Sequence, residues 1–267
     1  MNILDRLIEK ARDLLSEESS LRVDNVILGK TLYTMKNCDK VFSDMNFSLV
    51  LLEDAYGFAY FQEEINYVIG KYVNKSIFDI LKDDIPLYFK VALIDALYCL
   101  INKKRQQEHL HFSGNLREKA EARAKILLSY IPENSKVLLL GAVTEIIEES
   151  KQKNVNLKVL DLEPQKVGLQ FSETKIESNI STNLLELIKN VDYILTTGMV
   201  FVTDTADYIF KIAKENNVKI IMYMESGSNF GRELIDMGAH VVLSEFFPYY
   251  DFYGDTKYFV FENNTNN

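Results

Sequence analysis

Cysteine is scarce in this chain of 267 residues, which has only Cys38 and Cys99. Both lie in apolar surroundings and form no CxxC pair, so we expect buried free thiols. No apolar run approaches the ~20 residues that cross a bilayer. Charges at Asp5, Arg6 and Glu9 interrupt the segment where a signal peptide would have its apolar core. These absences predict a reducing, cytoplasmic setting.

Positive charge is also in short supply. The chain has 30 Lys and Arg against 39 Asp and Glu, which gives a net charge of −9. Proteins bind nucleic acids and anionic lipids through Lys and Arg that neutralise negative charge. We therefore expect neither a nucleic acid nor a membrane as partner. The remaining composition, 47% hydrophobic and 26% charged, is that of a globular protein able to bury a full core.

The length favours two domains, and the patterning changes character along the chain. The first part combines an amphipathic helix, β-rich runs that read as an antiparallel meander broken at Gly29, and further helices. The expected elements are a helix over 3–15, strands over 23–28, 30–35, 47–53 and 58–61, and helices over 77–83 and 87–102. A polar stretch follows, which predicts an α+β domain over 1–108 and a second domain over 109–267.

The second domain alternates short apolar runs with helical patterns. Continuous apolar runs of this length are typical of strands that are buried on both faces of a parallel sheet. The expected strands are 136–140, 157–160, 193–195, 219–224 and 240–243, with helices over 118–130, 145–151, 184–189, 205–216 and 230–237. This alternation predicts an α/β, Rossmann-like sheet with right-handed crossovers and helices on both faces.

In an open parallel sheet, ligands bind beyond the carboxyl ends of the strands. The loop after the first strand offers Gly141 and Thr144, but it has one glycine where a dinucleotide fingerprint has three. The loop after the second strand offers Asp161 and Glu163. They stand about 20 residues beyond Gly141, where Rossmann proteins hold a ribose. A solvated acidic loop is the alternative.

The remaining three loops supply further polar groups. In the loop after the third strand, Thr203 or Asp204 is expected to cap the next helix and leave N–H groups free for a ligand. The loop after the fifth strand adds a carboxylate beside aromatic residues able to wall a flat ligand. The candidate ligand-binding residues in these loops are Thr196, Thr197, Gly198, Thr203, Asp204, Glu225, Ser226 and Glu245.

Histidine offers one further candidate. His109 and His111 stand two residues apart, so in an extended strand both imidazoles leave the same face and could share a metal ion. Two ligands do not make a site, and the alternative is an ordinary interdomain linker. We find no GxSxG motif and no cysteine with a histidine partner for nucleophilic catalysis.

The third-strand segment resembles a known family. The residues 191–198 (VDYILTTG) followed by 202–205 (VTDT) are similar to the "aspartate, apolar pair, Thr-Gly, Val-Asn-x-Thr" motif of the heavy-metal chelation family. The resemblance implies a Rossmann-like C-terminal domain preceded by a cap like the N-terminal domain of enolase. This chain has Thr203 where members place Asn. It also has Glu225 to Ser228 where they have a Gly-Pro loop, which puts the identity of the ligand in doubt.

Three functional hypotheses follow. The first is a binding or accessory protein that holds a small ligand, metal-related or cofactor-like, between the cap and the Rossmann loops. The second is an enzyme, a transferase using S-adenosylmethionine, with Asp161 or Glu163 on the ribose and Gly141 beneath the amino acid portion. The third is a homodimeric structural module that pairs through the N-terminal helix or the edge of the cap sheet.

Overall fold

A computed structural model of the chain describes residues 1–15, 21–34, 41–65, 67–103, 109–171, 174–178, 181–247 and 254–263. Cys38 and most of the polar stretch that contains the predicted domain boundary lie outside these residues. The division at residue 108 therefore stays a prediction. Among the described residues, none of the helices has both the length and the apolar character needed to span a bilayer.

The N-terminal unit is an antiparallel sheet covered on one face by helices, as expected. Its elements are α1 (Ile3–Leu14), β1 (Asn25–Thr34), β2 (Val41–Leu52), β3 (Ala55–Phe61), the 3-10 helix η1 (Tyr67–Tyr72), α2 (Ile77–Ile80) and α3 (Leu87–Lys103). The strands form a meander in the order β1-β2-β3. The predicted break at Gly29 is wrong. Gly29 continues β1 and pairs with Phe47 of β2, whose ring occupies the space that a side chain at position 29 would need.

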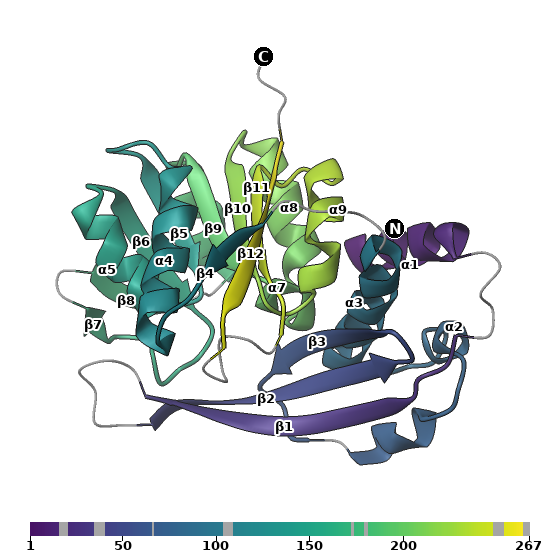
Figure 1. Ribbon diagram of the computed structural model, residues 1–267. Helices are drawn as coiled ribbons and strands as arrows, with labels where there is room; N and C mark the ends of the chain where they lie inside the picture. The colour runs from purple at the N-terminus through teal and green to yellow at the C-terminus, as the bar shows by residue number, and fades with distance from the viewer. Residues whose placement is uncertain are drawn as a thin grey trace.

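Helix α3 is the central support of this unit. Its residues Val91 to Leu97 are all buried, as the nearly continuous apolar pattern predicts. Strand β3 lies so close to α3 that a side chain at Gly57 would collide with the backbone at Ala92 and Ala96. Figure 1 shows the three-stranded sheet along the bottom of the molecule, with α3 above it and α1 beside the upper end of α3. The tight packing at Gly57 fixes the position of β3.

The C-terminal unit is built on a large mixed sheet. Its elements are β4 (Leu110–Phe112), α4 (Leu116–Ser129), β5 (Lys136–Leu140), α5 (Thr144–Gln152), β6 (Asn156–Asp161), β7 (Gln170–Phe171), β8 (Thr174–Ser178), α6 (Ser181–Ile188), β9 (Tyr193–Thr197), α7 (Met199–Val202), α8 (Ala206–Glu215), β10 (Lys219–Met224), η2 (Ser228–Phe230), α9 (Gly231–Asp236), β11 (Val241–Glu245) and β12 (Thr256–Glu262). The α/β class is confirmed, and the five predicted strands are parallel. The sequence pattern does not predict strands β4, β7, β8 and β12.

The parallel strands follow the order β8-β6-β5-β9-β10-β11, which is 3-2-1-4-5-6 in chain order. Doubly wound nucleotide-binding sheets have the same order. Alternate residues of each strand enter opposite cores. Leu138 and Ile194 pack with α6 to α9 and with α1 and α3, whereas Leu139 and Leu195 pack with α4 and α5. Helices therefore cover both faces of the sheet, and one core runs without interruption into the N-terminal unit.

A buried polar seam joins the two units. Asp95 of α3 lies with no exposed surface between β3 and the loop after β10. Its carboxylate accepts hydrogen bonds from Phe58 N at 2.9 Å, Asn229 N at 2.7 Å and Asn229 Nδ2 at 3.0 Å. Asn102 donates to Asn229 O at 2.7 Å, and Gly227 N donates to Phe58 O at 3.1 Å. These bonds hold the loop after β10 against β3.

Burial raises the pKa of Asp95 from 3.8 to about 7, although the hydrogen bonds from Phe58 and Asn229 oppose the shift. Between these values the unfolded chain has released this proton and the folded chain retains it. The contribution of Asp95 to stability is complete below pH 4 and falls by roughly 1 kcal/mol per pH unit as the pH rises toward 7. We expect Asp95→Asn to abolish this dependence. The variant should also be less stable than the wild type, because the side-chain amide that replaces the carboxyl group is mispaired with the surrounding N–H donors.

The measurement is urea unfolding of the wild type and the variant at pH 4.5 and pH 7. The stability gap between wild type and Asp95→Asn should be larger at pH 4.5. Asp83→Asn, at an exposed position, serves as control and should leave the pH dependence unchanged. An equal gap for Asp95→Asn at both pH values would show that Asp95 does not titrate in this range.

Candidate functional site

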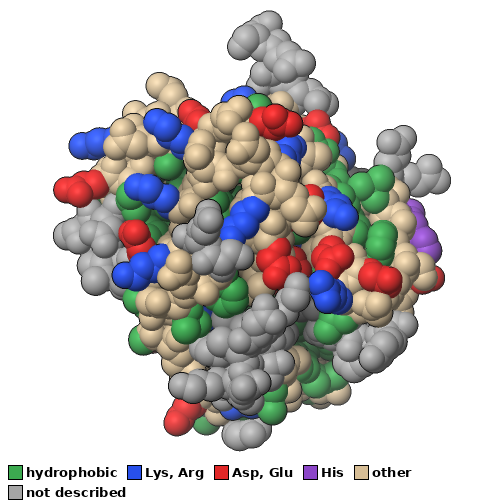
Figure 2. All heavy atoms as spheres, turned by 90° about the vertical axis from the view of Figure 1, so that its left-hand side faces the viewer, with side chains coloured by type: hydrophobic (Ala, Val, Ile, Leu, Met, Phe, Trp, Pro, Cys, Tyr) green, Lys and Arg blue, Asp and Glu red, His purple; other side chains and the backbone are tan. Residues whose placement is uncertain are grey.

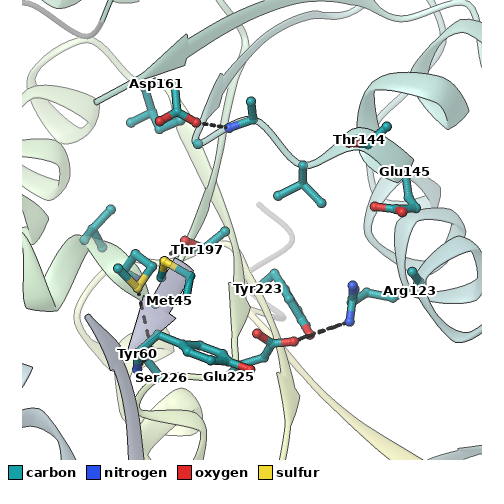
Figure 3. A pocket seen from close by; sticks show the side chains of 18 of the residues that line it. Met45, Tyr60, Arg123, Thr144, Glu145, Asp161, Thr197, Tyr223, Glu225 and Ser226 are labelled. Carbon is teal, nitrogen blue, oxygen red and sulfur yellow. Dashed lines mark hydrogen bonds and ion pairs between the residues drawn. The ribbon is translucent and has the colours of Figure 1, made fainter. Parts of the chain in front are cut away.

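A cavity of about 780 Å³ lies at the carboxyl ends of the parallel strands (Figure 3). It is lined by the loops after β5 and β9, which are neighbours in the sheet. From this pair the chain continues toward opposite edges, so the cavity occupies the switch point at which doubly wound sheets bind ligands. Met45, Tyr60 and Gln62 of the N-terminal unit line the opposite wall. Both units therefore contribute to the cavity.

Two glycines shape the loops at the switch point. Gly141 has a φ of +93°, a conformation that favours glycine, and a side chain there would meet no atom within 4 Å. Its backbone therefore borders open space. Gly198 has the opposite role, because a side chain there would collide with the backbone oxygen of Ser226. The loops after β9 and β10 can approach each other only because position 198 is glycine.

Asp161 lines the cavity at the end of β6, as predicted, but its carboxylate holds the protein's own backbone. Oδ2 accepts a hydrogen bond from Ala142 N at 2.7 Å, and Oδ1 accepts one from Glu163 N at 2.8 Å. The first of these bonds ties the loop after β5 to the end of β6. Glu163 does not line the cavity and pairs with Lys166 Nζ at 2.8 Å.

The segment 196–205 is more ordered than a polar loop. It contains the short buried helix α7, and its threonine hydroxyls bond locally: Thr203 Oγ1 donates to Met199 O at 3.1 Å and lies 3.0 Å from Thr205 Oγ1. The predicted capping role of Thr203 or Asp204 is wrong. The N-cap of α8 is Thr205, which makes no side-chain capping bond. Asp204 is exposed, and its backbone is in the left-handed region at a φ of 55°.

A buried charged cluster closes one end of the cavity. Arg123 Nη1 of α4 donates to Tyr223 OH at 2.7 Å and to Glu245 Oε2 at 3.1 Å, and it lies 3.4 Å from Glu225 Oε1. Tyr223 OH also contacts both carboxylates, and Thr256 donates to Glu245. Burial, followed by the neighbouring carboxylates, raises the pKa of Tyr223 well above its usual value, against the opposing effect of Arg123. Tyr223 therefore remains a hydrogen-bond donor.

The wall from the N-terminal unit meets the loop after β10 directly. Tyr60 N donates to Ser226 Oγ at 2.8 Å, and Ser226 Oγ lies 4.0 Å from Met199 Sδ. The two described aromatic residues after β11 are used in packing. Phe247 stacks on Phe58 with ring centroids 4.4 Å apart, and Phe246 stacks on Phe259. This places Phe247 in the contact between the units.

The histidine pair lies elsewhere. His111 Nε2 is 3.3 Å from Asp255 Oδ2, and the His109 ring lies 5.3 Å from that of Phe259. Neither histidine lines the cavity. Within the described parts of the chain, no three or more His, Cys, Asp or Glu side chains are grouped so that they could hold a metal ion. A metal-binding role for the pair stays a prediction without support from these contacts.

The structure brings most of the predicted ligand-binding residues together. Those that line the cavity are Gly141, Thr144, Asp161, Thr197, Gly198, Thr203, Glu225 and Ser226. Those that do not line it are Glu163, Thr196, Asp204 and Glu245. Thr196 is buried, and its hydroxyl has no hydrogen-bond partner among the residues that the structure describes, whereas Glu245 lies behind Arg123. Lining residues that the sequence did not reveal include Met45, Tyr60, Arg117, Arg123, Lys166 and Tyr223.

The architecture is that of a doubly wound α/β protein with an antiparallel cap at the carboxyl ends of its parallel strands. Residues 124–223 match the sequence model of the DUF364 family, described as "Putative heavy-metal chelation". This match confirms the resemblance inferred from the third-strand segment. No curated protein matches the chain.

Two solved structures from the same family share the fold over most of this chain. A protein of unknown function from Desulfitobacterium hafniense is 11% identical with a TM-score of 0.58, and the match covers 91% of this chain and 86% of that one. A protein of unknown function from Pyrococcus horikoshii is 15% identical with a TM-score of 0.59, covering 97% and 99%. At these identities the likeness shows the fold alone.

Replacing Asp161 should affect the protein even without a ligand. Asp161→Ala leaves Ala142 N and Glu163 N without their acceptor, so we expect a loss of about 1–3 kcal/mol in the free energy of unfolding. Urea denaturation of the purified protein measures it. Asp161→Asn keeps one acceptor oxygen and should lose less. An unchanged midpoint for Asp161→Ala would contradict the structural role given to this carboxylate.

Proposed function

We propose that this protein binds a small organic ligand, connected with metal handling, in the cavity between the N-terminal unit and the loops of the parallel sheet. The observation that carries the proposal is the position of the cavity at the β5/β9 switch point. Its volume of about 780 Å³ falls within the ~300–1,000 Å³ of small-molecule sites. A single metal ion would leave most of that space unfilled.

The lining supports an organic ligand. Apolar atoms supply most of the cavity surface, although polar and charged side chains are more numerous than apolar ones among the described lining residues. Known small-molecule sites likewise use apolar walls for contact area and polar groups to fix the orientation. The connection with metals rests on the description of the matching family. A metal could then arrive as part of a complex with the organic ligand.

The alternative is a transferase that uses S-adenosylmethionine. Two observations favour an adenosine cofactor: the 3-2-1-4-5-6 strand order and the position of Asp161 at the end of β6. The engagement of both Asp161 oxygens by backbone N–H groups weighs against it. Titration calorimetry with S-adenosylmethionine separates the two functions, because saturable binding would favour the transferase.

The main experiment asks what occupies the cavity. Native mass spectrometry of the freshly purified protein should show a species heavier than the 30.8 kDa chain, and elemental analysis should detect a metal in the same sample. Met45→Trp places a larger side chain in the wall from the N-terminal unit, so we expect this variant to lose the bound species. Identification of the released compound then names the ligand.

Two matched variants control for indirect effects. Met45→Leu conserves the side-chain volume and should retain the ligand. Leu32→Trp introduces the same indole on the same sheet at a position that is 69% exposed, and it should also retain it. If the ligand persists in Met45→Trp, or if the wild type carries none and binds none, the cavity is not the binding site proposed here.

A further inference from the structure

Charge is unevenly distributed around the cavity. Among its described lining residues, Glu121, Glu145, Glu148, Asp161 and Glu225 supply five carboxylates against the three cationic side chains Arg117, Arg123 and Lys166. This leaves an excess of two negative charges. Figure 2 shows the face of the molecule that includes α4 and α5, with acidic groups near its middle and basic groups around them.

Carboxylates of the protein itself engage all three cations. Arg117 Nε bonds Glu121 Oε1 at 2.7 Å, Arg123 bonds Glu245 at 3.1 Å, and Lys166 Nζ bonds Glu163 at 2.8 Å. Glu245 and Glu163 do not line the cavity, so they add negative charge behind its wall. An incoming anion would have to compete with these carboxylates for every cation. Charges act over a longer range in such a cavity, because its walls have a low dielectric.

The start of α5 is the focus of this negative charge. Thr144, Glu145 and Glu148 all line the cavity, and their spacing places them on one side of the helix. Glu145 forms no ion pair within the described parts of the chain, although the charge of Arg117, which is bonded to Glu121, also acts on Glu145 and Glu148. In phosphate-binding sheets the first turn of the corresponding helix binds the anion. Here that turn already carries a carboxylate, which satisfies the helix dipole from within the protein.

The Thr144 hydroxyl is a second, independent indication that a ligand binds at this point. Thr144 is only 8% exposed and lines the cavity at the first residue of α5. Its hydroxyl has no hydrogen-bond partner among the described residues. The hydroxyl oxygen is not among the fully buried unpaired atoms, so it faces open space, and a hydroxyl that borders the cavity without a protein partner is available to a ligand. Figure 3 shows Thr144 beside Glu145 at the α5 side of the cavity.

We infer that the cavity selects a ligand bearing a positive charge, an organic ammonium or a cationic metal complex, with that charge placed beside Thr144, Glu145 and Glu148. This inference deepens the proposed function and rests on it. The same electrostatics disfavours ligands with a phosphate at the switch point. The strand order is that of nucleotide-binding sheets, which bind an anionic phosphate at the switch point. The carboxylates at the switch point of this chain favour a cation instead.

A pair of inert metal complexes tests the sign of the charge. Hexaamminecobalt(III) and hexacyanocobaltate(III) are similar in size, diamagnetic and opposite in charge. Because the chain has a net charge of −9, binding is followed at the cavity itself, through the NMR signals of the Gly141 and Thr144 amides. We expect saturable shifts of both signals with the cation and none with the anion.

Charge-neutralising variants locate the effect. Glu145→Gln combined with Glu148→Gln should weaken cation binding at these amides by about tenfold, the loss expected for two charge interactions of modest strength. Thr144→Val, which keeps the shape and removes the hydroxyl, should weaken it less. Glu149→Gln lies on the same helix outside the cavity and should bind as the wild type does.

The inference is overturned if hexacyanocobaltate shifts the two amides as tightly as the cation does, or if the double variant binds the cation undiminished. It also fails if the compound released in native mass spectrometry is an anion, although the proposed function would then stand. A wild-type cavity that carries and binds no organic compound removes the proposed function whatever the result with the cobalt complexes.

Discussion

The structure depends on a carboxylate buried where two units meet. Asp95 belongs to a helix of the N-terminal unit, yet two of its three hydrogen bonds come from Asn229 in the C-terminal unit. A buried carboxyl group is tolerated only where hydrogen-bonding groups surround it, so the position of Asp95 specifies how the units dock. That docking places Tyr60 against Ser226 and thereby completes the wall of the cavity. A site made from both units can be no more ordered than the contact between them.

The parallel sheet is predictable from the sequence because its strands are buried on both faces. Runs such as Leu138 to Leu140 carry apolar residues without interruption, and such runs are visible in a single sequence. Strand β8 escapes prediction because Ile176 is its only described buried apolar side chain. The predicted break at Gly29 fails for a different reason. The ring that covers this glycine belongs to Phe47, on a neighbouring strand, and the amino-acid pattern around Gly29 does not indicate this contact.

The candidate site is predictable in position but not in its connections. Ligands bind at the carboxyl ends of parallel strands, and this rule identifies the loops that contain Gly141, Thr197 and Glu225 from the amino-acid pattern alone. It cannot identify Arg123, which reaches the cavity from α4 and bonds Tyr223, 100 residues further along the chain. Nor can it show that Asp161 already holds two backbone amides. The role of Arg123 depends on a contact between distant segments, and the bond from Ala142 to Asp161 on a contact between the loop after β5 and the end of β6, neither of which periodicity encodes.

One edge of the large sheet has a consequence for the order of folding. Strand β4, at the start of the C-terminal unit, pairs with β12, which is close to the end of the chain. During synthesis from the N-terminus, β4 leaves the ribosome early. It cannot pair with β12 until almost the whole C-terminal unit has been synthesised. The pairing of β12 with β11 also brings Thr256 to Glu245, so the buried carboxylate of Glu245 gains this hydrogen-bond donor only after residue 256 has been synthesised.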